Sequence, residues 1–431
     1  MKKIAIHFAR LGPYHLARLK SAGKVLGPMG WKVVALETAG GDATYAWERM
    51  ESVGQDFERR TVFKDRVFEE ISASEVKRAI FQELDKIQPQ AVAIAGWGTA
   101  DARACLAWCK KNGAKAIVMS ETRAADGRRV WWKEWIKSRL VRKFDGALCG
   151  GESHKRYLMA LGIPAERIEF GYNVVDNQFF WGSRNREEFS ETGAEQERNV
   201  WPYFLASNRF VERKNLKGLI RAYARYVESF QGGKKAWPLV LLGDGELRAE
   251  LEALCGELGL KTDTSTCAAC EKEGSRNSIR RNDLLNTSPS VHSVSSVVNS
   301  TNHPVDVGLV VFAGFRQIEE LPAFYAGAGA FVHPALEEPW GLVINEAMAS
   351  GLPVLSSRNV GAAEELVVDG KTGYLFNPNN IEEMANAMSK VAGMTQEERL
   401  TMGRAAFEML ERKAPVEAFG KGLAKLLMGK F

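Results

Sequence analysis

Residues 334–355 read Pro-Ala-Leu-Glu-Glu-Pro-Trp-Gly-Leu-Val-Ile-Asn-Glu-Ala-Met-Ala-Ser-Gly-Leu-Pro-Val-Leu. They follow an apolar run, Ala330–His333, which predicts a buried strand, and they pass through a Trp-Gly-Leu turn into a predicted helix. Two acids, Glu338 and Glu346, stand eight positions apart around that turn. Such a turn sets backbone amides at a helix N-terminus, where a phosphate is stabilised, with carboxylates on either side to accept from sugar hydroxyls. The layout favours a nucleotide-sugar over a bare nucleotide.

Apolar runs of strand length alternate with helical patterns along the whole chain. In the first half these runs are Lys3–Phe8, Trp31–Glu37, Ala91–Ala95, Ala116–Ser120 and Gly146–Cys149. In the second half they start at Tyr203, Leu239, Val310, Ala330, Pro353 and Thr372. This alternation predicts an α/β protein with parallel sheets covered by helices. Because 431 residues exceed the usual size of one core, we expect two doubly wound domains facing a central cleft.

The domain boundaries follow from changes in composition. We expect an N-terminal domain at residues 1–180, a polar and charged linker at 181–200, and a C-terminal domain at 201–415. Residues 416–428 have the apolar spacing of a helix. Residues 262–304 are rich in Ser, Thr and Asn and break the alternation. We interpret them as an insertion, either a tolerated surface excursion or a carrier of regulation or partner binding.

The composition is that of a globular protein. The net charge of +5 permits an anionic ligand or surface without requiring one. No run of about 18 apolar residues occurs, and the apolar run after Met1 is too short for a secretory signal. Cys105 and Cys109 are expected to be small buried hydrophobes. For Cys267 and Cys270 we keep two interpretations, a structural zinc site that lacks recognised further ligands and a reduced pair in a loop. Reduced thiols and no signal favour the cytoplasm.

Several segments together resemble one enzyme family. The segments that carry the resemblance, besides the paired acids, are Tyr172–Asp176, Ser207–Asn215, Val240–Gly245, Val310–Phe315, Gly-Leu-Pro-Val at 351–354 and Asp-Gly-Lys-Thr-Gly at 369–373. In these motifs the chain is similar to the retaining glycosyltransferases of family 4, which have the GT-B architecture of two Rossmann-like domains. The resemblance covers nearly the whole chain and is strongest over residues 199–390. It implies that the last helix, at about 416–431, packs back onto the first domain.

The resemblance implies a donor site for a nucleotide diphosphate sugar in the C-terminal domain. Arg209 and Lys214 correspond to the family's phosphate clamp, and a pair of cations suits a diphosphate. Glu338 corresponds to the acid that contacts the transferred sugar, and Glu346 to the acid that accepts from the ribose hydroxyls. The backbone amides expected to receive the diphosphate are those of Gly341, Leu342 and Val343.

Two residues beside these motifs have no clear family role. We interpret Arg213 as a solvated cation. We interpret His333 as a packing histidine whose hydrogen bonds are satisfied, with a role in the site as the alternative.

The first domain contributes a glycine turn and candidate residues for the acceptor side. Gly12 follows the first strand and matches the family glycine that lets the backbone approach the donor phosphates, although an ordinary strand-to-helix turn explains it equally. Tyr14 and His15 either bind the acceptor or pack the start of the helix. Many family members have a histidine after a later strand, where this chain has Ser120 and Glu121. That departure leaves the identity of the sugar open.

Residues 123–143 combine cations with tryptophan. The segment holds eight cations, two acids and three interleaved tryptophans: Trp131, Trp132 and Trp135. Tryptophan with arginine favours the headgroup layer of a membrane, and it also suits an anionic acceptor or rings packed under arginine. We keep open peripheral membrane contact, an anionic acceptor and structural packing. No nucleic-acid partner is expected, because no element for reading bases appears.

We therefore predict a glycosyltransferase that moves a sugar from a nucleotide diphosphate sugar, UDP- or GDP-linked, to a glycan or lipid-linked acceptor in cell-envelope or exopolysaccharide synthesis. The resemblance implies retention of the anomeric configuration. No two aspartates stand two positions apart, so the Asp-x-Asp metal clasp of the other large glycosyltransferase fold is missing. We expect a reaction without metal or cofactor, in the cytoplasm and extending to the inner face of the membrane. The alternatives are a GT-B sugar epimerase and a non-catalytic scaffold recruited to a membrane.

Overall fold

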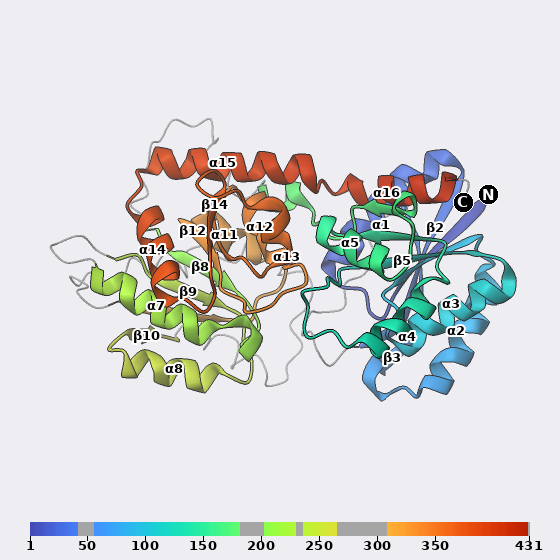
Figure 1. Cartoon of the computed structure of the whole chain (residues 1–431), viewed down its shortest axis with the longest axis horizontal. Helices are drawn as coiled ribbons and strands as arrows, with labels where there is room; N and C mark the ends of the chain where they lie inside the picture. The colour runs from blue at the N-terminus through green and yellow to red at the C-terminus, as the bar shows by residue number, and fades with distance from the viewer. Residues whose placement is uncertain (42–55, 182–201, 230–235, 265–307, 430–431) are drawn as a thin grey trace, which may run out of the picture. The chain divides into compact units, whose positions relative to one another are not determined.

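A computed structural model describes residues 1–41, 56–181, 202–229, 236–264 and 308–429 (Figure 1). The chain divides into two compact units. The first unit consists of Met1–Asp176 together with Ala414–Phe431, and the second unit is Asn177–Lys413. The boundaries expected from composition were 1–180 and 201–415.

Two predicted features fall largely outside the described residues. Of the expected linker at 181–200, only the first residue is described, and of the expected insertion at 262–304, only the first three residues are described. Cys267 and Cys270 lie outside the described part of the chain, so both interpretations of that pair remain predictions.

The described residues of the first unit form a seven-stranded parallel sheet in the order β3-β2-β1-β4-β5-β6-β7. The strands are β1 (Lys2–Phe8), β2 (Trp31–Gly41), β3 (Glu58–Val67), β4 (Ala91–Ala95), β5 (Lys115–Ser120), β6 (Gly146–Cys149) and β7 (Ile168–Phe170). The helices are α1 (Pro13–Leu26), α2 (Ala73–Ile87), α3 (Ala100–Asn112), α4 (Trp131–Val141), α5 (Glu152–Ala160) and α16 (Glu417–Met428).

The second unit repeats this plan. Its described residues form a seven-stranded parallel sheet in the order β10-β11-β9-β8-β12-β13-β14. The strands are β8 (Phe204–Ser207), β9 (Leu239–Leu242), β10 (Lys261–Asp263), β11 (Leu309–Gly314), β12 (Ala330–His333), β13 (Val354–Ser357) and β14 (Gly373–Phe376). The helical segments are η4 (Glu212–Lys214), α7 (Leu216–Ser229), α8 (Arg248–Glu257), α11 (Leu321–Gly327), α12 (Leu342–Ala349), α13 (Gly361–Leu366), α14 (Ile381–Ala392) and α15 (Gln396–Lys413).

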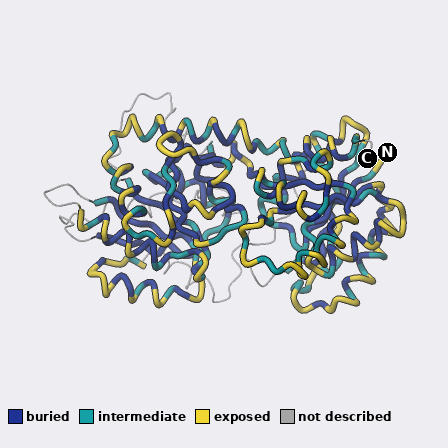
Figure 2. The backbone as a smooth tube through the Cα atoms, in the orientation of Figure 1, coloured by how far each residue is buried: buried dark blue, intermediate teal, exposed yellow. Residues whose placement is uncertain are grey.

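The central strands of each sheet are buried along most of their length (Figure 2). β9 reads Leu-Val-Leu-Leu and all four residues are buried, the pattern of a strand covered by helices on both faces. Each such aliphatic side chain contributes about 2 kcal/mol when it leaves water. The predicted α/β class with two doubly wound parallel sheets is confirmed.

The last helix belongs to the core of the first unit. α16 packs against α1, as Figure 1 shows, and against β6 and β7. The contact is close because glycine faces it: a Cβ built on Gly420 would lie 2.7 Å from the carbonyl oxygen of Ser21. The Lys115 ammonium donates to the carbonyls of Leu426 (2.9 Å) and Gly429 (3.1 Å) at the end of the helix. These bonds satisfy two of the carbonyls that a helix end leaves open.

None of the helices described here is long and apolar enough to cross a bilayer. Cys105 and Cys109 are buried and unpaired, as predicted, and burial raises the pKa of Cys109 to about 12. A thiol held protonated in this way is chemically inert at neutral pH.

Candidate functional site

In each sheet there is a point where the strand order reverses. In the second unit this point lies between β8 and β12, which pair in parallel through Phe204 with Ala330 and Leu205 with Phe331. The strands that follow β8 in the chain, β9, β10 and β11, lie on one side of this point. The strands that follow β12, β13 and β14, lie on the other side. Ligands of open α/β sheets bind at the carboxyl ends of the strands at such a point. Of the predicted donor-site residues, Arg209 and Lys214 follow β8, and Glu338 follows β12.

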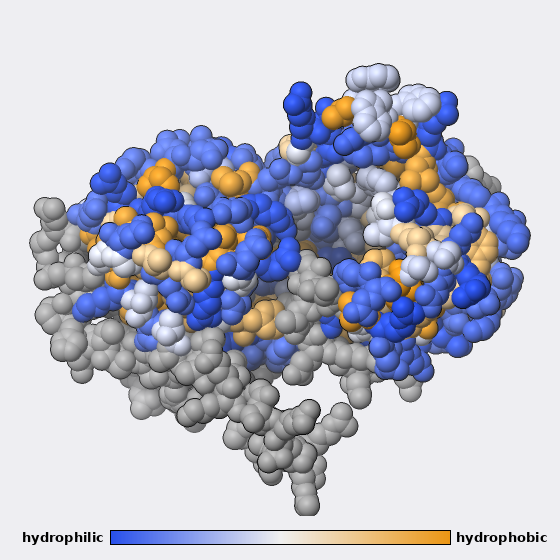
Figure 3. Space-filling view, turned by 90° about the horizontal axis from the view of Figure 1, so that it is seen from below, coloured by the Kyte–Doolittle hydropathy of each residue, from blue (hydrophilic) through white to orange (hydrophobic). Residues whose placement is uncertain are grey.

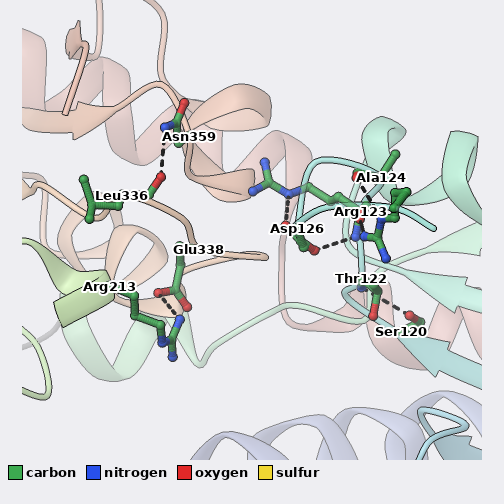
Figure 4. Close-up of polar contacts among 10 residues, drawn as sticks. Ser120, Thr122, Arg123, Ala124, Asp126, Arg213, Leu336, Glu338 and Asn359 are labelled. Atoms are coloured by element: carbon green, nitrogen blue, oxygen red, sulfur yellow. Dashed lines mark hydrogen bonds and ion pairs between the residues drawn. The ribbon is translucent and has the colours of Figure 1, made fainter. Parts of the chain in front are cut away.

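Lys214 and Glu338 form the centre of this cluster. The Lys214 ammonium donates to Glu338 Oε2, and the Arg213 guanidinium donates to the same oxygen at 3.0 Å. Figure 4 shows Arg213 and Glu338 directed toward each other from separate segments of the unit. Lys214 and Glu338 are largely buried, whereas the Arg213 side chain is 44% exposed. Arg213 is exposed to solvent, as interpreted, and in addition it pairs with the Glu338 carboxylate.

The electrostatics of the cluster keep a surplus of positive charge. Burial opposes ionisation of Glu338, but the charges of Lys214 and Arg213 outweigh it and hold the pKa of Glu338 below its usual value. Burial lowers the pKa of Lys214, Glu338 opposes this effect, and Arg213 and Arg209 reinforce it. Arg209 therefore lies close enough for its charge to act on Lys214. Lys214 and Arg213 pair with Glu338, and Arg209 brings a third positive charge near Lys214. Such a group of cations suits a ligand with several negative charges.

Backbone contacts hold the two loops together. Asn215, in the left-handed region at φ 55°, ends η4 and donates through its amide to the carbonyls of Pro334 (3.2 Å) and Pro378 (2.8 Å). The Leu336 amide donates to the carbonyl of Arg213 at 2.9 Å. Asn359 donates in turn to the carbonyl of Leu336 at 2.8 Å (Figure 4). The Lys214–Glu338 pair is thus fixed by its own loops.

His333 ends β12 and lies close enough to Lys214 and Glu338 for both charges to act on its ring. Its ring is fully buried, and neither ring nitrogen has a hydrogen-bond partner among the described residues. Burial and the charge of Lys214 lower the pKa of His333 to about 3, so the ring is neutral. The prediction that His333 is a packing histidine with satisfied hydrogen bonds is therefore wrong in one respect. The ring packs on Phe331, but its two nitrogens have no hydrogen-bond partner among the described residues. Unpaired buried polar groups are rare and call for a specific explanation.

The turn before α12 has the predicted glycine. Gly341 adopts φ 93°, and a Cβ there would lie 3.0 Å from Val360 Cγ1 and 3.3 Å from Glu338 Cγ. α12 begins without a side-chain cap, and Leu342 and Val343 in its first turn are half-buried. The N–H groups of a first turn have no partner within the helix, so these amides suit an anionic oxygen.

Glu346, the second predicted acid, is fully buried in α12. The Tyr325 hydroxyl donates to Glu346 Oε2 at 2.7 Å. Tyr325 is a partner that the sequence did not indicate, because the two residues come from different helices and 21 positions apart. The structure brings Arg209, Lys214 and Glu338 close to one another. Glu346 lies buried in α12 and is hydrogen-bonded to Tyr325.

In the first unit, two backbone amides of the loop after β1 have side-chain acceptors. The Gly12 amide donates to His15 Nδ1 at 3.0 Å, so His15 caps the helix that Gly12 begins. The His15 ring also lies 4.1 Å from the Phe8 ring, centre to centre. Of the two interpretations of His15, this geometry shows helix-start packing. The neighbouring Leu11 amide donates to Glu37 Oε1 at 2.9 Å.

Arg18 is the residue of this region that the sequence did not mark. It is almost fully buried, its Nε donates to the carbonyl of Val174 at 3.3 Å, and its guanidinium lies 4.9 Å from the centre of the Tyr172 ring. Burial lowers the pKa of Arg18, while Tyr172, Glu121 and Tyr14 oppose the shift. The predicted acceptor-side residues Tyr14 and Glu121 therefore both lie near Arg18. The apolar spacing of α1 gives no signal for this arginine.

Parts of this chain are similar to known glycosyltransferases. Residues 308–409 match the family described as glycosyl transferases group 1. Sulfoquinovosyl transferase SQD2 of Arabidopsis thaliana is 40% identical over 104 residues, 24% of this chain and 20% of that protein. The alpha-1,3/1,6-mannosyltransferase alg-2 of Neurospora crassa is 27% identical over 306 residues, 66% of this chain and 58% of that protein. The lipopolysaccharide core biosynthesis glycosyltransferase LpsE of Rhizobium meliloti is 28% identical over 190 residues, 44% of this chain and 39% of that protein.

These matches span less than two thirds of the length of the curated relatives. Among solved structures, HepE of Anabaena in complex with UDP is 16% identical, covers 99% of both chains and has a TM-score of 0.64. The two parallel sheets together with this likeness define a chain with the GT-B fold. Residues 308–409, which match that family, contain Glu338, Gly341 and Glu346.

Proposed function

We propose that this chain is a glycosyltransferase that uses a nucleotide diphosphate sugar as donor. The observation that carries the proposal is the cluster in which Lys214 and Arg213 pair with Glu338 and Arg209 acts on Lys214. This cluster lies where the strand order of the second sheet reverses, and Glu338 belongs to the segment that matches the group 1 family. A diphosphate carries several negative charges, and it gains one more when its bond to the sugar breaks. A site with surplus positive charge stabilises that development.

In the reaction that we propose, each residue of the cluster has a separate task. Lys214 and Arg209 stabilise the departing diphosphate, and Arg213 adds a third cation. The amides of Leu342 and Val343 contact a phosphate oxygen at the start of α12. Before the donor binds, Glu338 pairs with Lys214 and Arg213. The phosphates of the donor then replace Glu338 as the partners of these two cations. Glu338 is then available to the hydroxyls of the transferred sugar.

We further propose, from the family resemblance, that the anomeric configuration is retained. The bond between the anomeric carbon and the diphosphate oxygen breaks. The acceptor oxygen bonds to the anomeric carbon on the same face, and the acceptor proton passes to the leaving phosphate oxygen. Arg209 and Lys214 supply the charge stabilisation, so we propose a reaction that needs no metal ion.

The donor and acceptor are proposals by analogy. A UDP-sugar is the first candidate, because HepE was solved with UDP, and a GDP-sugar is the second. The likeness to LpsE favours a glycan or lipid-linked acceptor in cell-envelope synthesis, with the chain working in the cytoplasm. An epimerase or a non-catalytic scaffold is not favoured, since both the group 1 domain and the cluster are intact.

Nucleotide release from UDP-, GDP- and ADP-sugars tests the proposal. We expect the wild type to hydrolyse one of these donors slowly without an acceptor and Lys214→Ala to lower that rate about 100-fold, the effect of removing one donor to a developing oxyanion. Lys217→Ala is the matched control, because Lys217 lies three residues further on and pairs with Glu212 and Glu250 on the surface. Equal rates in wild type and Lys214→Ala, or no nucleotide bound at all, would overturn the proposal.

A further inference from the structure

Helix α4 turns its apolar residues outward. Trp131 is 81% exposed, Trp132 47%, Trp135 51% and Ile136 54%. At 3.6 residues per turn these four side chains fall within about 140° of the helix circumference. We call them the tryptophan face. Figure 3 shows ring-bearing side chains of intermediate hydropathy that project from the surface beside strongly hydrophilic and apolar ones.

The opposite side of α4 carries polar groups that are used inside the unit. Tyr157 of α5 donates to Glu134 Oε2 at 2.6 Å, and the Lys137 ammonium donates to Glu134 Oε1 at 2.7 Å. Arg129, just before the helix, donates to the Tyr157 hydroxyl at 3.1 Å. Val141 is the buried residue of the helix. α4 is therefore attached through this polar network and, at its end, through Val141 and Leu140, which pack into the core. Its largest apolar side chains lie on the solvent side, which is unusual for a surface helix.

This inverted arrangement excludes the interpretation of the tryptophans as internal packing. Four large apolar side chains next to one another on one exposed helix side are more than scattered surface hydrophobics. Such contiguous patches mark interaction sites. The tryptophan face lacks a covering element among the described residues.

Unpaired cations border the tryptophan face. The exposed cations of this segment are Arg128, Lys133, Arg139, Arg142 and Lys143. None of these five forms an ion pair with any residue that the structure describes. The two acids of the segment are used internally, since Asp126 pairs with Arg123 and Glu134 with Lys137. The charge that faces solvent here is therefore positive.

We propose that the tryptophan face and its five cations bind an anionic lipid surface. Tryptophan is stable at the headgroup layer, where the ring is half buried and the indole N–H stays hydrated, and arginine and lysine meet lipid phosphates there. Arg139 already lies 3.7 Å from the centre of the Trp135 ring, a pair that can enter that layer together. A second copy of the chain fits poorly, because the same five cations would face one another.

Cosedimentation of the full chain with lipid vesicles tests this proposal without any sugar donor. We expect binding to vesicles that contain phosphatidylglycerol, weak binding to pure phosphatidylcholine, and release by about 0.5 M salt, which screens the charges. Lys133→Gln/Arg139→Gln is expected to weaken binding about 25-fold, since each cation near an anionic leaflet contributes about fivefold. Trp131→Ser/Trp135→Ser is expected to weaken it at least about tenfold.

Matched substitutions elsewhere in the first unit are the controls. Lys77→Gln/Arg78→Gln removes two exposed cations of α2, and Met159→Ser removes an exposed apolar side chain of α5 that is 44% exposed. Both variants are expected to bind vesicles like the wild type. The proposal is overturned if the wild type stays in solution with anionic vesicles, as it would if an acidic protein were the partner. It is overturned equally if Trp131→Ser/Trp135→Ser binds unchanged. Because no donor is present, failure here leaves the proposed transferase activity intact.

Discussion

The loops beyond β8 and β12 in the second unit and the loop beyond β1 in the first unit occupy corresponding places in two similar sheets, but they use their polar groups differently. In the second unit, Lys214 and Arg213 pair with Glu338, Arg209 acts on Lys214, and His333 has two ring nitrogens without a hydrogen-bond partner among the described residues. In the first unit, the Gly12 amide is bonded to His15 and the Leu11 amide to Glu37. The loops of the second unit gather cations at a carboxylate, whereas these two backbone amides of the first unit's loop already have acceptors.

This difference indicates which loops bind phosphate. Surplus charge and unsatisfied polar atoms lower stability unless a ligand uses them, so they are expected where a ligand binds. A loop that satisfies its own amides keeps its shape without a ligand. We therefore expect the diphosphate to depend on the second unit's cluster much more than on Gly12.

The largest effect is expected for Glu338→Gln, which removes the one carboxylate of the cluster. Lys214 would remain buried without a counter-charge, so we expect the free energy of unfolding at pH 7 to fall by about 3 kcal/mol. UDP should then raise the melting temperature of the variant more than that of the wild type, because its diphosphate no longer competes with Glu338. Thermal unfolding with and without UDP measures both.

Glu250→Gln is the control for that experiment. Glu250 also pairs with a lysine, Lys217, but its side chain is 59% exposed. Exposed pairs contribute at most about 1 kcal/mol, so little change is expected. If Glu338→Gln were as mild as this control, or gained nothing from UDP, Glu338 would not be holding the phosphate-binding cations.

A smaller effect is expected for His333→Phe, which tests the unsatisfied nitrogens. The pKa of His333 falls from 6.5 in the unfolded chain to about 3 in the fold, so the unfolded chain binds the extra proton between these values. Stability from the neutral ring is therefore fully present above pH 6.5 and is lost as pH falls toward 3. Removing the ring should flatten this decline, by up to about 1.4 kcal/mol per pH unit.

At pH 8 the same variant separates two roles of His333. If the two nitrogens bind a ligand, His333→Phe should keep or raise the free energy of unfolding, because removing unpaired buried polar groups gains about 1 kcal/mol. Nucleotide release should then become slower in this variant. Urea unfolding at pH 8 and pH 5, together with the release assay, gives both quantities. A variant less stable at pH 8 with unchanged release would show His333 to be structural.

The fold was predictable where strands are apolar on both faces. β12 spans Ala330–His333, as predicted from its apolar run. β3, Glu58–Val67, was not predicted, because it is an edge strand whose residues are half-buried or exposed and include several charges. Its position depends on pairing with β2, a tertiary contact that local apolar content does not express.

The site was predictable in its parts and not in its pairing. The motifs indicated Arg209, Lys214 and Glu338, but not that Lys214 and Glu338 bond directly across 124 positions or that Arg213 joins them. That pairing depends on β8 lying beside β12, a consequence of strand order. His15 gave no signal for capping Gly12, since histidine is not a usual third residue of a capping box.

The smallest effect is expected for His15→Ala in the first unit. The Gly12 amide would lose its acceptor, so stability should fall by about 1 kcal/mol, the usual effect of losing a cap. His15→Gln should restore most of it, because glutamine at this position reaches back to the same amide. If the first unit's loop is internally satisfied, nucleotide release in both variants should stay within about threefold of the wild type, less than 1 kcal/mol. A loss near that of Lys214→Ala in both would place Gly12 and His15 among the groups that bind the diphosphate, and the contrast between the two units would then be wrong.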